Sequence, residues 1–138
     1  MAESTVVKID DVKIVKRGSG VATKPLITHA NAPTAKICTG ITTFPPGEGA
    51  RMHTHNCDEQ VTIIEGQGLV EIDGEITHVG VHDTTYILGG RPHRFHNTGE
   101  GPLSILWIYT ADHVTRTFTD TGETVEHLSS KDLLAPSA

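Results

Sequence analysis

Apolar and polar residues alternate in short runs along most of the chain, and Gly, Pro, Asn or Asp residues separate these runs. A period of two is typical of β-strands that bury one face, and no segment repeats its apolar residues at the helical period over several turns. The pattern predicts strands over residues 12–16, 36–44, 50–55, 60–65, 69–73, 75–79, 84–88, 93–96, 103–109 and 114–118. So many short strands at close spacing indicate an all-β sandwich or barrel.

Turn-forming residues mark the connections between the predicted strands. Asp73 and Gly74 separate two of the runs, and the glycine can take the positive φ that a tight hairpin requires. Prolines and glycines over 45–47 and 88–92 break two other connections.

The chain divides into three stretches of one domain. Residues 1–35 alternate less clearly, and we expect an N-terminal arm or edge strands that either add to a sheet or reach a partner subunit. Residues 36–118 carry the predicted barrel core. Over 119–138 we expect a C-terminal strand within 121–128, a helical turn within 129–134 and a disordered tail at 135–138.

The length and the net charge of the chain limit the classes of protein to which it can belong. The 138 residues suffice for one domain with a hydrophobic core, and 11 basic against 17 acidic residues give a formal charge of −6. Because there is no basic run, nucleic acid and membrane surfaces are poor candidate partners. The N-terminus lacks the pattern of a signal peptide and no stretch is long enough to span a bilayer, so we expect a cytoplasmic protein. Cys38 and Cys57, without a CxxC spacing, do not indicate a disulfide framework.

Four residues of metal-ligating type fall in two segments. His53 and His55 lie two residues apart, so on a strand both imidazoles point to the same face. Glu59 follows four residues later, and His93 belongs to a second segment. Imidazole nitrogen and carboxylate oxygen suit divalent first-row metals, and four donors leave positions free around an ion that accepts six. These residues predict a three-nitrogen, one-oxygen metal site inside the barrel.

The spacing around the first segment resembles the first motif of the cupin superfamily. That motif is a glycine, five residues, His-x-His, three or four residues, Glu, six residues and a glycine. Here Gly47, His53, His55, Glu59 and Gly66 match it in full.

The second segment resembles the second cupin motif with two departures. Gly90, His93 and Asn97 fit the motif. Leu88 stands where proline is usual and His82 where glycine is usual, so the local loop shape is expected to differ while the ligand is kept. The resemblance covers about residues 41–110.

The resemblance implies a single-domain cupin jelly-roll β-barrel of two antiparallel sheets with little helix, often a homodimer, with one divalent transition metal ion at its centre. The ligands would be His53, His55, Glu59 and His93, and this donor set favours Fe²⁺ or Mn²⁺, with Zn²⁺ or Ni²⁺ as the alternatives. The favoured function is a dioxygenase-type enzyme acting on a small organic substrate. One alternative is a metal-dependent isomerase, decarboxylase or lyase, and another is a non-catalytic small-molecule or metal-binding module.

Candidate catalytic residues are less sharply defined. Arg51 shares the parity of the two histidines of the first segment, so it either clamps a substrate carboxylate at the barrel mouth or is a plain surface arginine. A reaction by proton transfer needs an acid or base in the cavity, for which His78, Tyr86 and Tyr109 are the candidates.

Other residues near the motifs have weaker signals. Cys57 is expected in the turn between two strands rather than as a redox group. His96 is an odd number of residues from His93 and should face away from the cavity, whereas Phe95 shares the parity of His93 and either walls the pocket or packs in the core. For His82, orientation of substrate and simple contact with solvent are both open.

Overall fold

The chain folds almost wholly into β-strands, as its alternating pattern predicts. The computed structural model describes residues 3–135. Within that range there are twelve strands and one single-turn 3-10 helix. The elements are η1 (Ile9–Asp11), β1 (Val15–Lys16), β2 (Ala22–Pro25), β3 (Cys38–Phe44), β4 (His53–His55), β5 (Glu59–Glu65), β6 (Gln67–Ile72), β7 (Glu75–Gly80), β8 (Thr84–Ile87), β9 (His93–Asn97), β10 (Leu103–Tyr109), β11 (Thr115–Phe118) and β12 (Thr124–Glu126).

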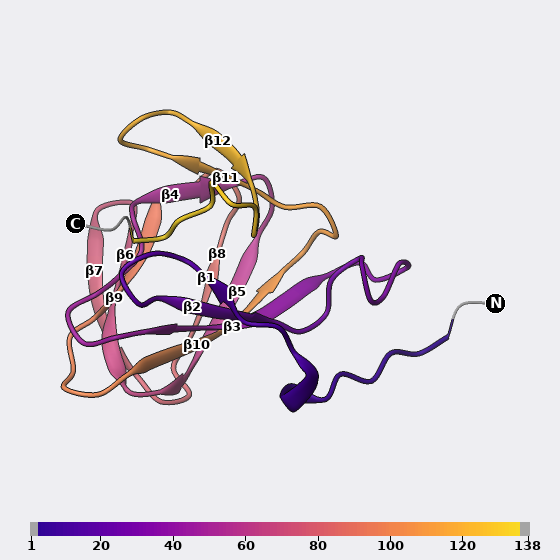
Figure 1. Cartoon of the computed structure of the whole chain (residues 1–138). Coiled ribbons are helices and arrows are strands. Elements are labelled where there is room, and N and C mark those ends of the chain that lie inside the picture. Colours follow the sequence, from indigo (N-terminus) through magenta and orange to yellow (C-terminus); the bar gives the residue numbers. More distant parts are fainter. Residues whose placement is uncertain (1–2, 136–138) are drawn as a thin grey trace.

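The strands form two antiparallel sheets that enclose the interior of a barrel. One sheet has the order β1-β2-β3-β10-β5-β8, and the other has the order β12-β11-β4-β9-β6-β7. Strands β4, β11 and β12 lie at the top of the view and β1, β2 and β3 at the bottom, with the interior between them (Figure 1). The predicted all-β jelly-roll of two antiparallel sheets is therefore confirmed.

The N-terminal region contributes two strands to a sheet edge. The predicted strand over 12–16 is reduced to β1, whereas β2 was not predicted because Ala22–Pro25 contains no clear alternation and ends in proline. Strand β2 pairs with β3, and β1 pairs with β2. Residues before β1 run outward from the barrel (Figure 1).

The C-terminal region departs from the predicted helical turn over 129–134. The backbone instead makes two consecutive turns, in which Ser129 N donates to Glu126 O and Asp132 N donates to Ser129 O. Leu128, just before this segment, has a positive φ of 66°. Within the predicted disordered tail, Ala135 is buried with 5% exposure, while 136–138 lie outside the described residues.

A two-residue hairpin joins β6 to β7. Asp73 and Gly74 both have positive φ, 52° and 84°, which is the type I′ geometry that matches the twist of paired strands. The turn predicted from this dipeptide is confirmed. It fixes the register in which Ile72 pairs with Glu75 and Gly68 with Val79.

Trp107 occupies the interior beside β3. Its ring lies over Gly40, where an added Cβ would stand 2.3 Å from the indole, so only glycine leaves room for it. The indole N–H donates to Thr42 Oγ1 at 2.9 Å. This contact fixes the indole against the inner face of the sheet, where its exposed fraction is 2%.

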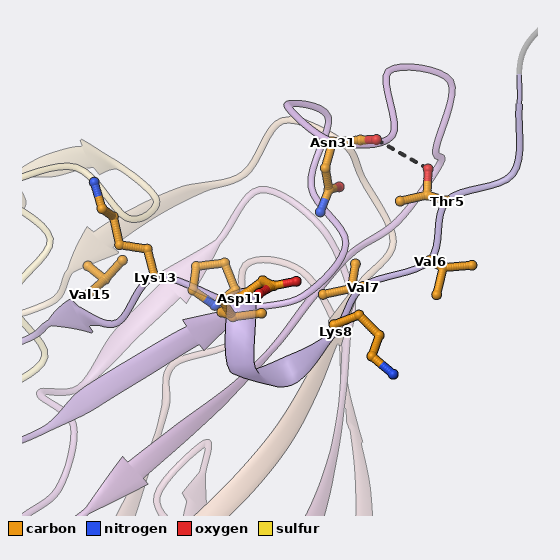
Figure 2. Close-up of a pocket in the computed structure, with 10 residues that line it drawn as sticks. Thr5, Val6, Val7, Lys8, Asp11, Lys13, Val15 and Asn31 are labelled. Carbon is orange, nitrogen blue, oxygen red and sulfur yellow. Dashed lines mark hydrogen bonds between the residues drawn. The ribbon is translucent and has the colours of Figure 1, made fainter.

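The outer surface also carries a hollow beside the N-terminal segment, with a volume of about 420 Å³ (Figure 2). Thr5 Oγ1 donates to Asn31 O across it at 3.2 Å. Its lining includes Lys8, Asp11 and Lys13 but no histidine or cysteine. None of the helical segments within 3–135 has the length and apolar character needed to cross a membrane.

Candidate metal centre

Three histidines and one glutamate meet inside the barrel. His53 and His55 project inward from β4 and His93 from the start of β9, all in one sheet. Glu59 enters from the start of β5 in the opposite sheet. The four residues are buried, with exposed fractions between 2% and 5%. The site therefore spans both sheets.

The three imidazoles are close enough to share one ion. One nitrogen of each ring lies within 4.8 Å of the corresponding nitrogens of the other two. Two nitrogens bound to one ion at about 2.1 Å lie at most about 4.2 Å apart, so small ring movements close the site. The shortest separation between ring centroids is 4.4 Å, between His53 and His93, which are directly paired across β4 and β9.

Backbone carbonyls hold the histidine rings in one orientation. Each ring places Nδ1 against a carbonyl oxygen, which can only accept, so Nδ1 carries the proton and Nε2 is left with a lone pair. The acceptors are the carbonyls of Arg51, Thr115 and Arg91, at 2.6, 3.0 and 2.9 Å. This outer contact is typical of metal-bound histidine, because it fixes both the tautomer and the ring angle.

Glu59 completes the donor set. Its Oε1 lies 3.2 Å from His93 Nε2 and 3.7 Å from His55 Nε2. Burial alone would raise the pKa of Glu59, but the contact with His93 and the nearby positive groups hold this pKa below its usual value. Burial lowers the pKa of His53 and His55 well below the ordinary value. Neutral imidazoles and an ionised carboxylate are the forms that bind a metal.

The donor atoms form a cluster of acceptors with few hydrogens between them. With Nδ1 protonated, three Nε2 lone pairs and the Glu59 carboxylate converge on one point. The Tyr109 hydroxyl, 3.2 Å from His55 Nε2, supplies one donor. Buried acceptors that face each other are unfavourable unless a cation lies among them. The residues therefore fit a bound metal ion.

The space beside the donors is small. The cavity has a volume of about 20 Å³, close to what one water molecule occupies. Trp107, Tyr109 and His127 wall it, and their rings contact one another at centroid distances of 4.9 to 5.1 Å. Burial raises the pKa of Tyr109 well above its usual value, and the Glu59 charge adds to this effect. Tyr109 is therefore a protonated hydroxyl at neutral pH.

Two arginines and one aspartate, which we call the arginine cluster, lie at the same cavity: Arg17 and Arg116 line it and Asp132 contacts both. Arg17, Arg116 and Asp132 have exposed fractions of 1%, 3% and 0%. Arg17 donates to Asp132 Oδ2 at 2.7 Å, to Asp132 O at 2.9 Å and to Thr23 Oγ1 at 2.9 Å. Arg116 Nε lies 2.8 Å from Asp132 Oδ1, without the alignment of a hydrogen bond.

The three candidate catalytic residues Arg51, Tyr86 and His78 lie outside the cavity lining. Arg51 Nη2 pairs with Asp120 at 2.7 Å and its guanidinium stacks over Phe118, so it is not a clamp at the barrel mouth. Tyr86 is 57% exposed and donates to Asp58 at 2.8 Å. His78 is exposed on the edge strand β7. Strand parity suggested Arg51 and proton-transfer chemistry suggested Tyr86 and His78, but neither signal identifies which side chains reach the cavity.

The remaining motif residues have structural positions. His82, at the usual glycine position, has a φ of 75°, so the loop keeps the left-handed backbone despite the change. Asn97 donates to Phe44 O and Gly101 O, which holds the end of β9. Phe95 lines the cavity, while His96 does not. Cys57 lies in the bend between β4 and β5, and burial raises the pKa of its thiol to about 11.

Sequence reasoning missed the arginine cluster and His127. Arg116 did carry a signal, because it shares the parity of Val114 and Phe118 and so belongs to the buried face of β11. Arg17 and Asp132 carried none, since each comes from a terminal segment with weak patterning and they meet only in the folded chain.

A family comparison agrees with this geometry. The family described as "Cupin domain" matches residues 40–109. The chain belongs to the cupin family, as a small single-domain member.

Curated relatives match part of the chain. An uncharacterized protein of Methanocaldococcus jannaschii is 40% identical over 63 residues, which are 45% of this chain and 50% of that protein. The mannose-1-phosphate guanylyltransferase of Escherichia coli is 32% identical over 74 residues, which are 52% of this chain and 15% of the enzyme. The chain thus spans half or less of the length of these relatives.

Solved structures share the fold at low identity. The polyketide cyclase RemF from Streptomyces resistomycificus superposes with a TM-score of 0.69 at 17% identity, covering 94% of this chain and 89% of that one. An oxalate decarboxylase from Bacillus subtilis superposes with a TM-score of 0.71 at 22% identity, covering 81% and 31%. These likenesses show the fold alone.

Proposed function

We propose that the chain is a metalloenzyme that holds one divalent transition metal ion through His53, His55, Glu59 and His93 and acts on a small organic molecule. The convergence of three Nε2 lone pairs and one carboxylate carries this proposal. Nitrogen and oxygen donors favour Fe²⁺ or Mn²⁺, with Zn²⁺ or Ni²⁺ as the alternatives.

The favoured reaction is of the dioxygenase type. An ion held by four protein donors offers open positions to a substrate oxygen and to dioxygen. The cavity of about 20 Å³ beside the donors has room for about one water-sized ligand, and Trp107 walls it against bulk water. Burial lowers the pKa of His53 and His55, and the contact with His93 lowers the pKa of Glu59, so these three side chains are in the forms that bind a metal.

Tyr109 favours a second candidate, a metal-dependent isomerase, decarboxylase or lyase. Its buried hydroxyl is protonated and lies 3.2 Å from a donor nitrogen, which is where a general acid would reach a bound substrate. Proteins of similar fold include an oxalate decarboxylase and an oxalate oxidase. In this reading Tyr109 gives its proton to a substrate carbon or oxygen and recovers it from solvent.

Elemental analysis of protein purified without a histidine tag tests the metal proposal. We expect about one ion per chain in the natural protein and less than about one-tenth of an ion after His55→Ala, because the loss of one imidazole leaves too few donors. His78→Ala is the matched control, since His78 is exposed, and it should keep its metal. Unchanged metal content in His55→Ala would contradict the proposal.

Oxygen dependence separates the two reactions. Oxygen uptake with catechols, enols or β-diketones in the Fe²⁺-loaded protein supports the dioxygenase type. Turnover under strict anaerobiosis, lost in Tyr109→Phe, supports the proton-transfer type. Saturable ligand binding with no turnover under either condition would instead identify a binding module.

A further inference from the structure

Three rings wall one side of the small cavity at the metal donors. They belong to Trp107, Tyr109 and His127, and we call them the ring wall. The donors themselves, which we call the donor cluster, are His53, His55, Glu59 and His93. Because the cavity of about 20 Å³ has room for only one water-sized group, an organic substrate needs space for its carbon skeleton elsewhere.

A larger hollow, which we call the outer pocket, supplies such space. Its volume is about 320 Å³, within the range of small-molecule sites. Among residues 3–135, His127 alone lines both the outer pocket and the cavity at the donor cluster. Cys38 lines the outer pocket and is paired directly with Tyr109 across β3 and β10. The ring wall therefore separates the outer pocket from the donor cluster.

His127 is the member of the ring wall that the protein holds least firmly. Trp107 and Tyr109 lie on β10, inside a six-stranded sheet. Each has its polar group engaged, because Trp107 donates to Thr42 and the Tyr109 hydroxyl contacts His55. His127 instead follows the three-residue edge strand β12, and its ring contacts two other rings but forms no hydrogen bond within the described chain. A rotation of this side chain opens the ring wall without breaking a hydrogen bond.

The floor of the outer pocket is apolar. Cys38 and Val114 are buried there, and Leu128 is half-buried. The flat face of the His127 ring belongs to the same lining. Apolar side chains beside a ring favour a planar, aromatic ligand, which buries its carbon atoms against them.

The exposed rim of the outer pocket is acidic. Asp112 and Glu126 lie on it, and no lysine or arginine within residues 3–135 lines the pocket. His29 and His113 complete the rim, where His113 pairs with Glu126 at 3.1 Å. The acidic rim repels a carboxylate ligand, whereas the hydroxyl groups of an uncharged ligand can donate to it.

We propose that the outer pocket binds the ring of an uncharged hydroxylated aromatic molecule of the catechol type, and that His127 is the gate through which its hydroxyl oxygen reaches the donor cluster. The small cavity at the donors has room for a group of that size. This inference rests on the proposed function and names its substrate class.

Titration of the metal-free natural protein with catechol tests the outer pocket. Trp107 is the one tryptophan of the chain and contacts His127, so its fluorescence reports a ligand on the other side of the ring wall, with calorimetry as a second measurement. We expect saturable binding of catechol, and binding of benzoate that is weaker by about tenfold or more because the rim repels its carboxylate. Absence of saturable catechol binding in both measurements would overturn the inference.

Reversal of one rim charge tests the choice of ligand class. Glu126→Lys should raise the ratio of benzoate affinity to catechol affinity about fivefold or more, because only benzoate is charged. Glu123→Lys is the matched control, since Glu123 is also exposed but does not line the outer pocket, and it should leave the ratio unchanged. An equal ratio in Glu126→Lys and Glu123→Lys would contradict selection by the rim.

The rate at which catechol reaches bound iron tests the gate. Catecholate bound to ferric iron absorbs visible light, so stopped-flow absorbance of the Fe³⁺-loaded protein follows the arrival of the hydroxyl oxygen. If His127 must move first, the rate levels off at high catechol concentration, and His127→Ala should raise this limiting rate about tenfold or more. His78→Ala, an exposed residue on β7, should keep the natural rate.

Equal limiting rates in the natural protein and His127→Ala, at equal iron content, would overturn the gate. Iron content is measured on the same samples, so a failure of the proposed metal site is seen separately. Protein that binds catechol but takes up no iron would support the outer pocket and contradict the metal site.

Discussion

The donor cluster and the arginine cluster satisfy their buried polar groups in different ways. At the donor cluster, acceptors converge and each imidazole has its second nitrogen satisfied by a carbonyl. At the arginine cluster, cations converge and two guanidiniums share one carboxylate. The first arrangement calls for a cation, whereas in the second the Glu59 carboxylate, which lines the same cavity, adds its negative charge to that of Asp132.

The largest expected effect is the loss of Asp132. Asp132→Asn removes the negative charge that both arginines face and weakens the bond that Leu128 N donates to Asp132 Oδ2 at 2.8 Å. Breaking a buried ion pair in this way costs about 3–5 kcal/mol of the free energy of unfolding. Urea denaturation measures it, with Asp120→Asn as the exposed control. A loss of less than about 1 kcal/mol would contradict the assignment of Asp132 as the ionised partner of both arginines.

Replacing the two arginines one at a time shows how much each contributes to the free energy of unfolding. Arg17→Met should lower the free energy of unfolding by about 2–4 kcal/mol, because three aligned bonds are lost and Thr23 and Asp132 keep unsatisfied atoms. Arg116→Met should cost less than about 1 kcal/mol, since its removal leaves a balanced Arg17–Asp132 pair. Thermal and urea unfolding of both variants checks this order. Equal losses would make Arg116 a structural residue.

A gradual effect of pH on stability should arise at the donor cluster. Burial, followed by the charge of Arg116, lowers the pKa of His53, His55 and His127 well below the ordinary value. As pH falls below about 6.5, the unfolded chain takes up protons that the folded metal-free chain resists. Its free energy of unfolding is therefore greatest above that pH and falls by up to about 1.4 kcal/mol per pH unit for each histidine.

Urea denaturation of metal-free protein between pH 5 and 7.5 measures this slope. His53→Gln should make the slope shallower, because one of the three groups no longer titrates. Arg17 adds nothing in this range, since its pKa, although lowered by burial and by Arg116, stays at about 10. A flat profile in the natural protein would contradict the assignment of neutral, buried imidazoles.

Local patterns predicted much of the fold and the donor cluster. The alternation in Cys38–Phe44 and Leu103–Tyr109 identifies strands because each buries one face. The His-x-His spacing places two imidazoles on one face for the same reason. Strands with little alternation in their sequence were not predicted. Ala22–Pro25 is an example, because this segment is extended through its pairing with β3 and not through local preference.

Contacts between residues far apart in the sequence determined the other features of the site. Strand parity suggested Arg51, and the ability to transfer a proton suggested Tyr86 and His78. Ion pairing with Asp120, exposure beside Asp58 and an edge-strand position keep these three side chains out of the cavity lining. Arg17 and Asp132 are 115 residues apart in the sequence, and their ion pair forms only because the fold brings the two segments together.

The amino-acid sequence by itself determined the class of fold, the donor types and the side of the strand on which they lie, because these follow from residue spacing with a period of two. Only the tertiary structure decided that Glu59 reaches His93 from the opposite sheet, and that two arginines share one aspartate beside them. Such contacts depend on how the two sheets are brought together, and spacing along the chain does not encode that distance.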